Sequence, residues 1–361
     1  MKKTKFLAYL LVLAICLGMC GCASTENGSS ATEESKASEN SVVSDSVSEA
    51  VSEAESSTEE SKAEKDPTII RVGGLKGPTS MGMVKVMKDN KEGTALNNYE
   101  FTIEAAADSL APLMLQGKLD IAAVPTNLAS VLYNKTEGKV KLLAVNTLGV
   151  LYIVHRGEKL SVADLKGKTL YATGKSAVPE YALRYVLSQN GIDPDKDITI
   201  EWKSQPDEVV AVLSADENAI AMLPQPYVTV ASTKVEGLEI ALDLTEEWDK
   251  LESGSRLITG TLVVSAEFAE NHPELVANFL EEYKASTEFV NANVEDAAAL
   301  VEEFDIVKAA IAKKAIPYCN IVFISGEEMK APVEGYLQTV FDQNETAVGG
   351  KLPDENFYYG K

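Results

Sequence analysis

The chain has 361 residues and a formal net charge of −22. So large an acidic excess argues against a nucleic acid partner and offers no polybasic surface for anionic lipid. The length also exceeds that of one ordinary domain, so we expect two compact parts.

Residues 1–22 have the pattern of a targeting segment. Three lysines precede the apolar run Phe6–Leu17, which is too short to span a bilayer comfortably. The sequence MCGC at positions 19–22 then looks like the lipobox of a bacterial lipoprotein signal peptide. We predict that Cys22 receives the lipid, palmitate, and Cys20 is the alternative. A plain secretory signal cut after Cys22 is also open, and in each case the protein leaves the cytoplasm.

Residues 23–66 are rich in Ser, Glu, Ala and Val and contain no aromatic side chain. This stretch has 12 acidic and three basic residues. Such a composition cannot bury enough apolar surface to offset the chain entropy lost on folding. We therefore predict a disordered Ser/Glu-rich linker that holds the folded part away from the membrane.

The segment Pro67–Met83 opens the folded part. Its β-branched run Thr68–Val72 predicts a strand, and the glycines after it predict a loop. The hydroxyl residues that begin Thr79–Met87 predict the start of a helix. A strand, a glycine loop and a helix N-terminus in this order leave backbone N–H groups facing an open edge, where a ligand can bind.

Strand, loop and helix alternate in the same way through residues 67–361. Further strands are predicted at Tyr99–Ala105, Asp120–Val124, Val140–Val145, Leu151–Val154, Leu170–Ala172, Ile198–Trp202, Ala219–Leu223 and Leu257–Ser265. The last third is mostly helical, with helices predicted at Pro273–Val290, Asp296–Glu303, Asp305–Lys314 and Glu327–Val340. Repeated β–loop–α units predict an α/β fold with mostly parallel sheets covered by helices.

Six loops join a strand end to a helix start: Lys76–Ser80, Ala107–Leu110, Pro125–Asn127, Thr173–Ser176, Ser204–Asp207 and Pro224–Tyr227. Ligands of α/β sheets bind at the carboxyl ends of strands, where such loops lie. We therefore predict a ligand site formed by residues from these loops: Gly77, Thr79, Ser80, Asp108, Ser109, Pro125, Thr126, Asn127, Thr173, Gly174, Lys175, Ser176, Gln225 and Tyr227.

The charges in these loops bear on the ligand's chemistry. Asp108 either caps a helix or accepts a hydrogen bond from an amine or amidine of the ligand. Lys76 and Lys175 either attract an anion or are simply solvated. No arginine lies in the six loops, so a bidentate clamp on a sulfonate or carboxylate is missing. This favours a neutral or weakly polar ligand, although helix N-termini alone can bind anions.

The residues that enzymes use are scarce. Of the two histidines, His155 follows an apolar strand, and His272 precedes a proline where a capping role is expected. Cys319 has no histidine nearby, so we expect a small buried residue, and as the only cysteine beyond the targeting segment it cannot form an internal disulfide. No spacing suggests a zinc site, a nucleotide P-loop or another cofactor site. The sequence therefore predicts a protein that is not an enzyme.

Four motifs together resemble a known family: VGGLKGPTSMGMVKVM, LMLQGKLDIAAVPTNLASVLYNK, LYATGKSAVPEYALRYVLSQNGIDP and AMLPQPYVTVA. They look like the substrate-binding proteins of ABC importers for nitrate, alkylsulfonates, taurine and thiamine-precursor pyrimidines. The resemblance implies a two-lobed fold of periplasmic-binding-protein type II, with two crossover strands forming a hinge. We place the crossovers near Asn146–Tyr152 and Arg256–Leu262. Lobe 1 would then comprise residues 67–148 and 260–361, and lobe 2 residues 149–259.

The function that follows from the resemblance is that of an extracytoplasmic solute-binding lipoprotein, anchored by lipid to the bacterial cell membrane. It would capture a small molecule between its lobes and deliver it to an ABC transporter permease, as a monomer. One alternative is a secreted enzyme on the same fold, similar to enzymes that make pyrimidine or menaquinone precursors. Another is a ligand-sensing module.

Overall fold

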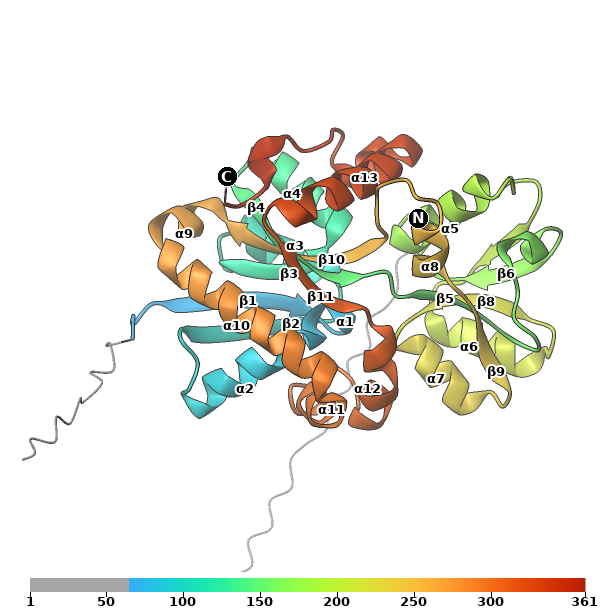
Figure 1. Cartoon of the computed structure of the whole chain (residues 1–361), viewed down its shortest axis with the longest axis horizontal. Coiled ribbons are helices and arrows are strands. Elements are labelled where there is room, and N and C mark those ends of the chain that lie inside the picture. The colour runs from blue at the N-terminus through green and yellow to red at the C-terminus, as the bar shows by residue number, and fades with distance from the viewer. Residues whose placement is uncertain (1–64, 361) are drawn as a thin grey trace, which may run out of the picture. The chain divides into compact units, whose positions relative to one another are not determined.

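Two β-sheets carry the helices of residues 65–360, the part of the chain that the computed structural model describes (Figure 1). The first sheet has the strand order β11-β4-β10-β3-β1-β2, and the second has the order β7-β6-β8-β5-β9. The first contains β1 (Ile69–Leu75), β2 (Asn98–Glu104), β3 (Ile121–Pro125), β4 (Val140–Leu148), β10 (Ile258–Ser265) and β11 (Ile321–Ser325). The second contains β5 (Leu151–Arg156), β6 (Thr169–Ala172), β7 (Thr199–Trp202), β8 (Ile220–Pro224) and β9 (Leu238–Asp243). We call the parts built on these sheets lobe 1 and lobe 2.

Helices connect the strands in both lobes. Those of lobe 1 are α1 (Pro78–Met81), α2 (Val84–Glu92), α3 (Ala107–Leu115), α4 (Thr126–Lys135), α9 (Ala266–Asn271), α10 (Pro273–Ala292), α11 (Val294–Glu303), α12 (Ala309–Ala315) and α13 (Glu327–Gln343). Those of lobe 2 are α5 (Val178–Gln189), α6 (Pro206–Ala215), α7 (Tyr227–Lys234) and α8 (Leu244–Asp249). Short 3-10 turns add η1 (Val162–Leu165), η2 (Ile316–Tyr318), η3 (Glu345–Val348) and η4 (Glu355–Phe357).

The strands predicted from the sequence are confirmed to within a few residues, but β9 and β11 were not predicted. Both are short apolar runs, IVFIS in β11 and LEIALD in β9, whose periodicity does not separate a strand from a helix. What makes them strands is long-range pairing, because β11 pairs with β4 and β9 pairs with β5.

The prediction of mostly parallel sheets is wrong for both sheets. Parallel pairing holds where a helix connects the strands, as for β1 with β2 and β3, and for β6 with β7 and β8. However, β10 runs antiparallel between β3 and β4, and β5 runs antiparallel between β8 and β9. These two strands enter their sheets from the other lobe, so a βαβ connection does not set their direction.

The helix predicted over Thr79–Met87 is in fact two helices, α1 and α2, with a break at Gly82. The break lies against α10, because a Cβ added at Gly82 would come within 2.7 Å of the hydroxyl oxygen of Tyr283. Close packing of Tyr283 therefore favours glycine at position 82.

The chain passes between the sheets at two places, the first within the predicted crossover range 146–152 and the second ending at the start of the predicted range 256–262. The first passage lies between Leu148, the end of β4, and Leu151, the start of β5. Asn320 holds it, since its Nδ2 donates to the Gly149 carbonyl at 2.6 Å and its own carbonyl accepts from the Leu148 amide at 3.0 Å. The second passage precedes Ile258, where β10 starts. The residue limits of the lobes, 67–148 with 260–361 and 149–259, stay a prediction.

Candidate functional site

The loop after β1 presents two buried hydroxyl residues on α1. Thr79 is 7% exposed and Ser80 is fully buried, whereas Gly77 before them adopts a φ of 133° that favours glycine. The Oγ of Ser80 lies over Gly74 of β1 and makes no hydrogen bond within the described residues. A buried hydroxyl without a partner costs free energy, so the unpaired state of Ser80 needs an explanation.

Asn146 on β4 fixes the position of Thr79. Its Nδ2 donates to the Thr79 carbonyl at 2.9 Å and to the Tyr283 hydroxyl at 3.1 Å, and its Oδ1 accepts from the Thr147 hydroxyl at 3.1 Å. Gly260 on β10 allows this close approach, because an added Cβ would lie 2.6 Å from both Asn146 Oδ1 and Thr79 Cγ2. The loop after β1 is thus attached to β4 and β10, the two strands that lead into the passages between the lobes.

The loop after β3 contributes a second hydroxyl that lacks a partner. Pro125 ends the strand and pairs with Gly260. Thr126, fully buried at the start of α4, has an Oγ1 without a hydrogen-bond partner in residues 65–360. The next residue, Asn127, is already engaged, since its Nδ2 donates to the Ala347 carbonyl at 3.2 Å. The hydroxyl of Thr126 therefore has no partner within the described residues, while the amide of Asn127 has a structural one.

The loop after β2 is more exposed. Ser109 lies in the first turn of α3 with an exposed side chain, and its amide donates to the Ala106 carbonyl at 3.1 Å. Asp108 lies in the same turn, and its side chain is outside the described part of the structure.

In lobe 2, the loop after β6 is held in a constrained conformation. Thr173 is 7% exposed, Gly174 has a φ of 87° and packs under the ring of Pro179, and Lys175 is exposed. Ser176 has a φ of 61°, which is uncommon for a residue with a side chain. Its amide donates to Glu180 Oε2 at 2.6 Å, so this N–H is not free for a ligand.

The loop after β8 places a buried side-chain amide, that of Gln225, beside a pocket lined mostly by lobe 2. Gln225 is 3% exposed, and its Oε1 accepts from the amide and the hydroxyl of Thr229 at 3.3 and 2.9 Å. It lines a pocket of about 1000 Å³ together with β9, α7, α8 and the chain around η2. Tyr227, the first residue of α7, is 38% exposed.

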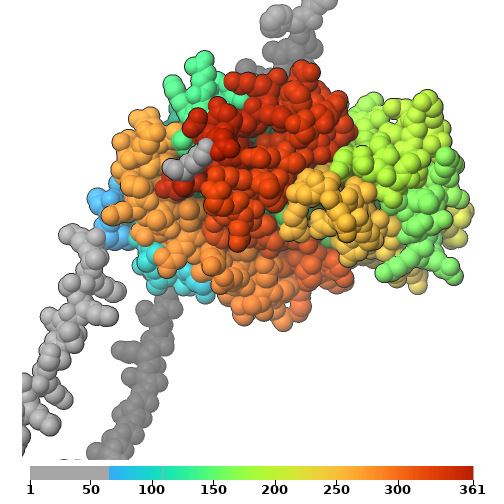
Figure 2. Space-filling model, turned by 45° about the horizontal axis from the view of Figure 1, so that its top comes forward, coloured from blue at the N-terminus to red at the C-terminus, as the bar shows by residue number. Residues whose placement is uncertain are grey.

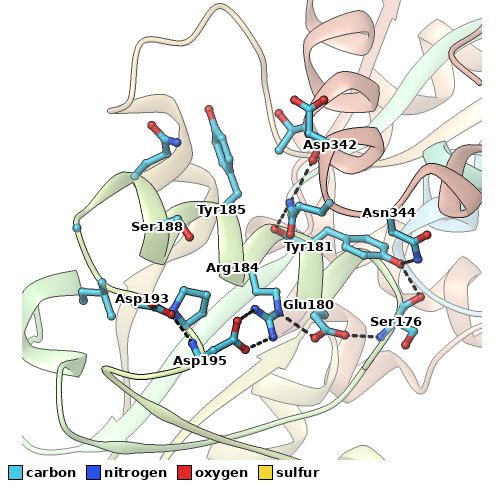
Figure 3. A pocket seen from close by; sticks show the side chains of 16 residues that line it. Ser176, Glu180, Tyr181, Arg184, Tyr185, Ser188, Asp193, Asp195, Asp342 and Asn344 are labelled. Atoms are coloured by element: carbon cyan, nitrogen blue, oxygen red, sulfur yellow. Dashed lines mark hydrogen bonds and ion pairs between the residues drawn. The ribbon is translucent and has the colours of Figure 1, made fainter.

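A groove of about 950 Å³ lies between α5 and the C-terminal end of α13, and Ser176 is at its rim (Figure 3). Arg184 spans its floor, with Nε 3.0 Å from Glu180 Oε1 and Nη2 2.6 Å from Asp195 Oδ1. Figure 2 shows the same contact from outside, where the red C-terminal segment lies against the green and gold residues of lobe 2. The charge of Arg184 in this groove is thus compensated by Glu180 and Asp195.

The structure brings some of the predicted residues together in lobe 1 but not in lobe 2. In lobe 1, Thr79 and Pro125 both adjoin Gly260. In lobe 2, Ser176 and Gln225 line different pockets, and no hydrogen bond within the described residues joins the lobe 1 set to the lobe 2 set. Sequence reasoning missed Asn146 and Tyr181, which position the loops. Their only sequence signal is a polar residue inside an apolar pattern, which does not reveal a partner far along the chain.

Of the two lysines that the sequence offered for binding an anion, Lys76 is paired with an acidic residue. Lys76 Nζ lies 2.6 Å from Asp305 Oδ2, which compensates its charge. The pKa of Asp305 is lowered, first by this hydrogen bond and then by the charge of Lys76. Lys175 remains exposed at the loop surface.

The three residues considered for catalysis, His155, His272 and Cys319, make contacts within the fold or are buried in it. His155 Nε2 lies 2.5 Å from the Glu158 carbonyl at the end of β5, and burial raises the pKa of the Cys319 thiol. His272 occupies the N-cap position of α10, but the expected capping is wrong for its side chain, which lies against the ring of Phe268 at 4.9 Å instead. Within residues 65–360, no three His, Cys, Asp or Glu side chains are grouped so that they could hold a metal ion.

Two mixed sheets with two passages between them define a two-lobed substrate-binding protein, and comparison with known proteins identifies the family. Residues 94–315 match the family described as ABC transporter, phosphonate, periplasmic substrate-binding protein. The chain belongs to this family. It is the extracytoplasmic substrate-binding component of an ABC importer and not an enzyme, as the resemblance implied, so its partners are a small-molecule ligand and an ABC permease. A search of curated proteins found no significant match.

Solved structures show the same fold. An ABC transporter protein from Parabacteroides distasonis is similar with a TM-score of 0.69 at 24% identity, covering 81% of this chain and 99% of that one. The aliphatic sulphonate binding protein SsuA from Escherichia coli has a TM-score of 0.62 at 16% identity, covering 82% and 95%. The ligand-binding component of an import system from Staphylococcus aureus has a TM-score of 0.58 at 14% identity, covering 81% and 99%. The predicted type II fold is confirmed.

Among the helices of residues 65–360, none combines the length and the apolar character that crossing a membrane requires.

Proposed function

We propose that the ligand binds between the lobes, at the carboxyl ends of β1, β3, β6 and β8. The observation that supports this most directly is that Ser80 and Thr126, which both follow strand ends, are among the buried hydroxyls that lack partners within the described residues. Both residues lie just after a strand and at the start of a helix. A bound molecule that hydrogen-bonds to them removes the free-energy cost of two unpaired polar groups.

We propose further that the ligand is neutral or weakly charged. The six loops contain no arginine, and Asp305 compensates the charge of Lys76. The description of the matching family names phosphonate, and the Escherichia coli protein is described as binding aliphatic sulphonates. An oxyanion of that kind would have to be held here by hydroxyls, main-chain N–H groups and Lys175, without an arginine.

The residue limits given above for the lobes belong to this proposal. The division of the strands supports them, because β1 to β4, β10 and β11 form one sheet and β5 to β9 the other. A ligand held from both sides would then draw together loops on either side of the two passages.

The site can be tested with a ligand panel and two variants. Thermal-shift screening would use ethylphosphonate, ethanesulfonate, nitrate, putrescine, a hydroxymethylpyrimidine and benzoate. For whichever compound binds, we expect Ser80→Ala and Thr126→Val each to weaken binding by about five- to a hundred-fold, since a lost buried hydrogen bond costs about 1–3 kcal/mol. Calorimetric titration measures this.

The matched control is Thr136→Val, because Thr136 on lobe 1 bonds the Leu132 carbonyl at the far end of α4. It should bind as the parent does. If Ser80→Ala and Thr126→Val also bind like the parent, the ligand does not contact these loops and the proposed site is wrong.

We propose that the protein is a lipoprotein anchored through Cys22, that residues 23–66 act as a spacer, and that it works as a monomer. Residues 1–64 lie outside the described part of the structure, so this rests on the sequence pattern around positions 19–22.

Cys22→Ser is expected to release the protein from the membrane or to leave its signal uncleaved. The thiol of this residue is the group that would receive the lipid, and serine cannot form the thioether. Membrane fractionation together with metabolic labelling by palmitate measures the effect, and Cys20→Ser is the control. Retained membrane association and label in Cys22→Ser, with loss of both in Cys20→Ser, would assign the anchor to Cys20.

A further inference from the structure

Tyr181 on α5 connects the end of α13 to the loop that carries Ser176. Its hydroxyl accepts from Asn344 Nδ2 at 3.0 Å and donates to the Ser176 carbonyl at 3.2 Å (Figure 3). Its carbonyl accepts from Gln343 Nε2 at 3.1 Å. One residue of lobe 2, only 6% exposed, therefore contacts both a ligand loop of its own lobe and the C-terminal segment of lobe 1.

The same C-terminal segment is fixed on its other side to lobe 1. We call residues Gln343–Val348 the C-terminal bridge. The Ala347 carbonyl accepts from Asn127 Nδ2, and the Val348 carbonyl accepts from Ser130 Oγ at 2.7 Å and from an Asn134 amide hydrogen at 2.9 Å. These donors lie on α4, whose first residues form the loop after β3. The bridge thus contacts a predicted ligand loop in each lobe.

The bridge is built to hold its amide toward Tyr181. Asn344 Oδ1 accepts from the Thr346 amide at 3.1 Å and from the Thr346 hydroxyl at 2.8 Å. With both acceptor directions of the oxygen used inside the bridge, Nδ2 is the atom that faces Tyr181. The hydrogen bonds inside the bridge therefore determine that Asn344 is the donor and the Tyr181 hydroxyl the acceptor in the contact between the lobes.

Ser176 needs such support because of its backbone. A φ of 61° on a residue with a side chain is maintained only when the surroundings constrain it. Two contacts do so: Glu180 accepts the Ser176 amide, and Tyr181 binds the Ser176 carbonyl. Arg184 in turn holds Glu180, with its Nε 3.0 Å from Glu180 Oε1.

We propose that Tyr181 and Asn344 are positioning residues, through which the C-terminal bridge holds the Ser176 loop of lobe 2 in register with the Asn127 loop of lobe 1. Its relevance to ligand binding rests on the proposed function, but the coupling between the loops does not. Losing the contact of Asn344 with Tyr181 should loosen the loops on both sides.

The test is hydrogen–deuterium exchange of the full-length chain without ligand, comparing Tyr181→Phe with the parent. Phenylalanine keeps the ring and the bond from Gln343 but removes both hydroxyl contacts. We expect amides of residues 174–177 and of residues 346–350 to exchange about two- to ten-fold faster, the effect of losing one neutral hydrogen bond. Tyr185→Phe is the matched control, since its hydroxyl makes no hydrogen bond within the described residues and it lies one turn along the same helix.

Asn344→Ala completes a double-mutant cycle, read only at residues 174–177. Asn344→Ala should accelerate exchange there when it is made in the parent. When it is made in Tyr181→Phe it should add little, because the hydroxyl that connects Asn344 to Ser176 is already gone. The proposal is overturned if Tyr181→Phe affects only one of the two segments, if Tyr185→Phe gives the same result, or if the two effects add. Because no ligand is present, this outcome is independent of the Ser80 and Thr126 titrations, so either proposal can fail alone.

Discussion

Trp248→Ala is expected to lower the free energy of unfolding by about 3–5 kcal/mol, the usual cost of removing a buried tryptophan. Trp248 on α8 is 1% exposed. Its ring lies 4.2 Å from that of Tyr185 in lobe 2 and 6.1 Å from that of Tyr336 on α13 in lobe 1. Its Nε1 also donates to Ser255 Oγ at 2.9 Å. The substitution would therefore remove packing within lobe 2 and across to lobe 1 at once.

Urea unfolding followed by circular dichroism measures the loss. Trp248→Phe serves as the control that keeps an aromatic ring, and it should recover most of the stability. Trp202→Ala, at the only other tryptophan of the chain, should cost less because Trp202 is only partly buried. A Trp248→Ala variant that is as stable as Trp202→Ala would show that the aromatic contact between the lobes contributes little.

Gly260→Val is expected to cost about 3 kcal/mol, at the upper end for overpacking a buried site. An added Cβ would lie 2.6 Å from Asn146 Oδ1, 2.6 Å from Thr79 Cγ2 and 3.2 Å from Thr147 Cβ. Asn146 cannot move aside easily, because it is fully buried and takes part in three hydrogen bonds. The strain should therefore reach Thr79 and weaken ligand binding as well as stability.

The matched control is Gly73→Val on β1. Its added Cβ would meet only the ends of the Leu119 and Leu110 side chains, at 2.5 and 2.7 Å, which can change rotamer. Unfolding in urea and calorimetric titration are measured on both variants. Equal stability losses, with unchanged affinity in Gly260→Val, would contradict the role assigned to the contact of Asn146 with Thr79.

These two predictions concern contacts that sequence reasoning did not find. Hydrophobic pattern and turn residues are local signals, and they located the strands around Ile70, Val124 and Leu223 and the loops that follow them. The resemblance to the importer family, and not these local signals, indicated that the chain crosses between lobes near Leu148 and Ile258. Pairing partners are not local, which is why the antiparallel insertion of β5 and β10 was not predicted.

For the candidate site, too, local sequence determined one part and tertiary structure the other. The sequence alone determined that hydroxyl residues such as Ser80 and Thr126 follow strand ends, because the strand–loop–helix pattern is written in neighbouring residues. Tertiary structure decided which of these groups are free: Ser80 and Thr126 lack partners within the described residues, whereas Asn127 is engaged by Ala347, 220 residues along the chain. A hydrogen bond over that separation depends on how α4 and the C-terminal bridge pack together, and no local pattern encodes it.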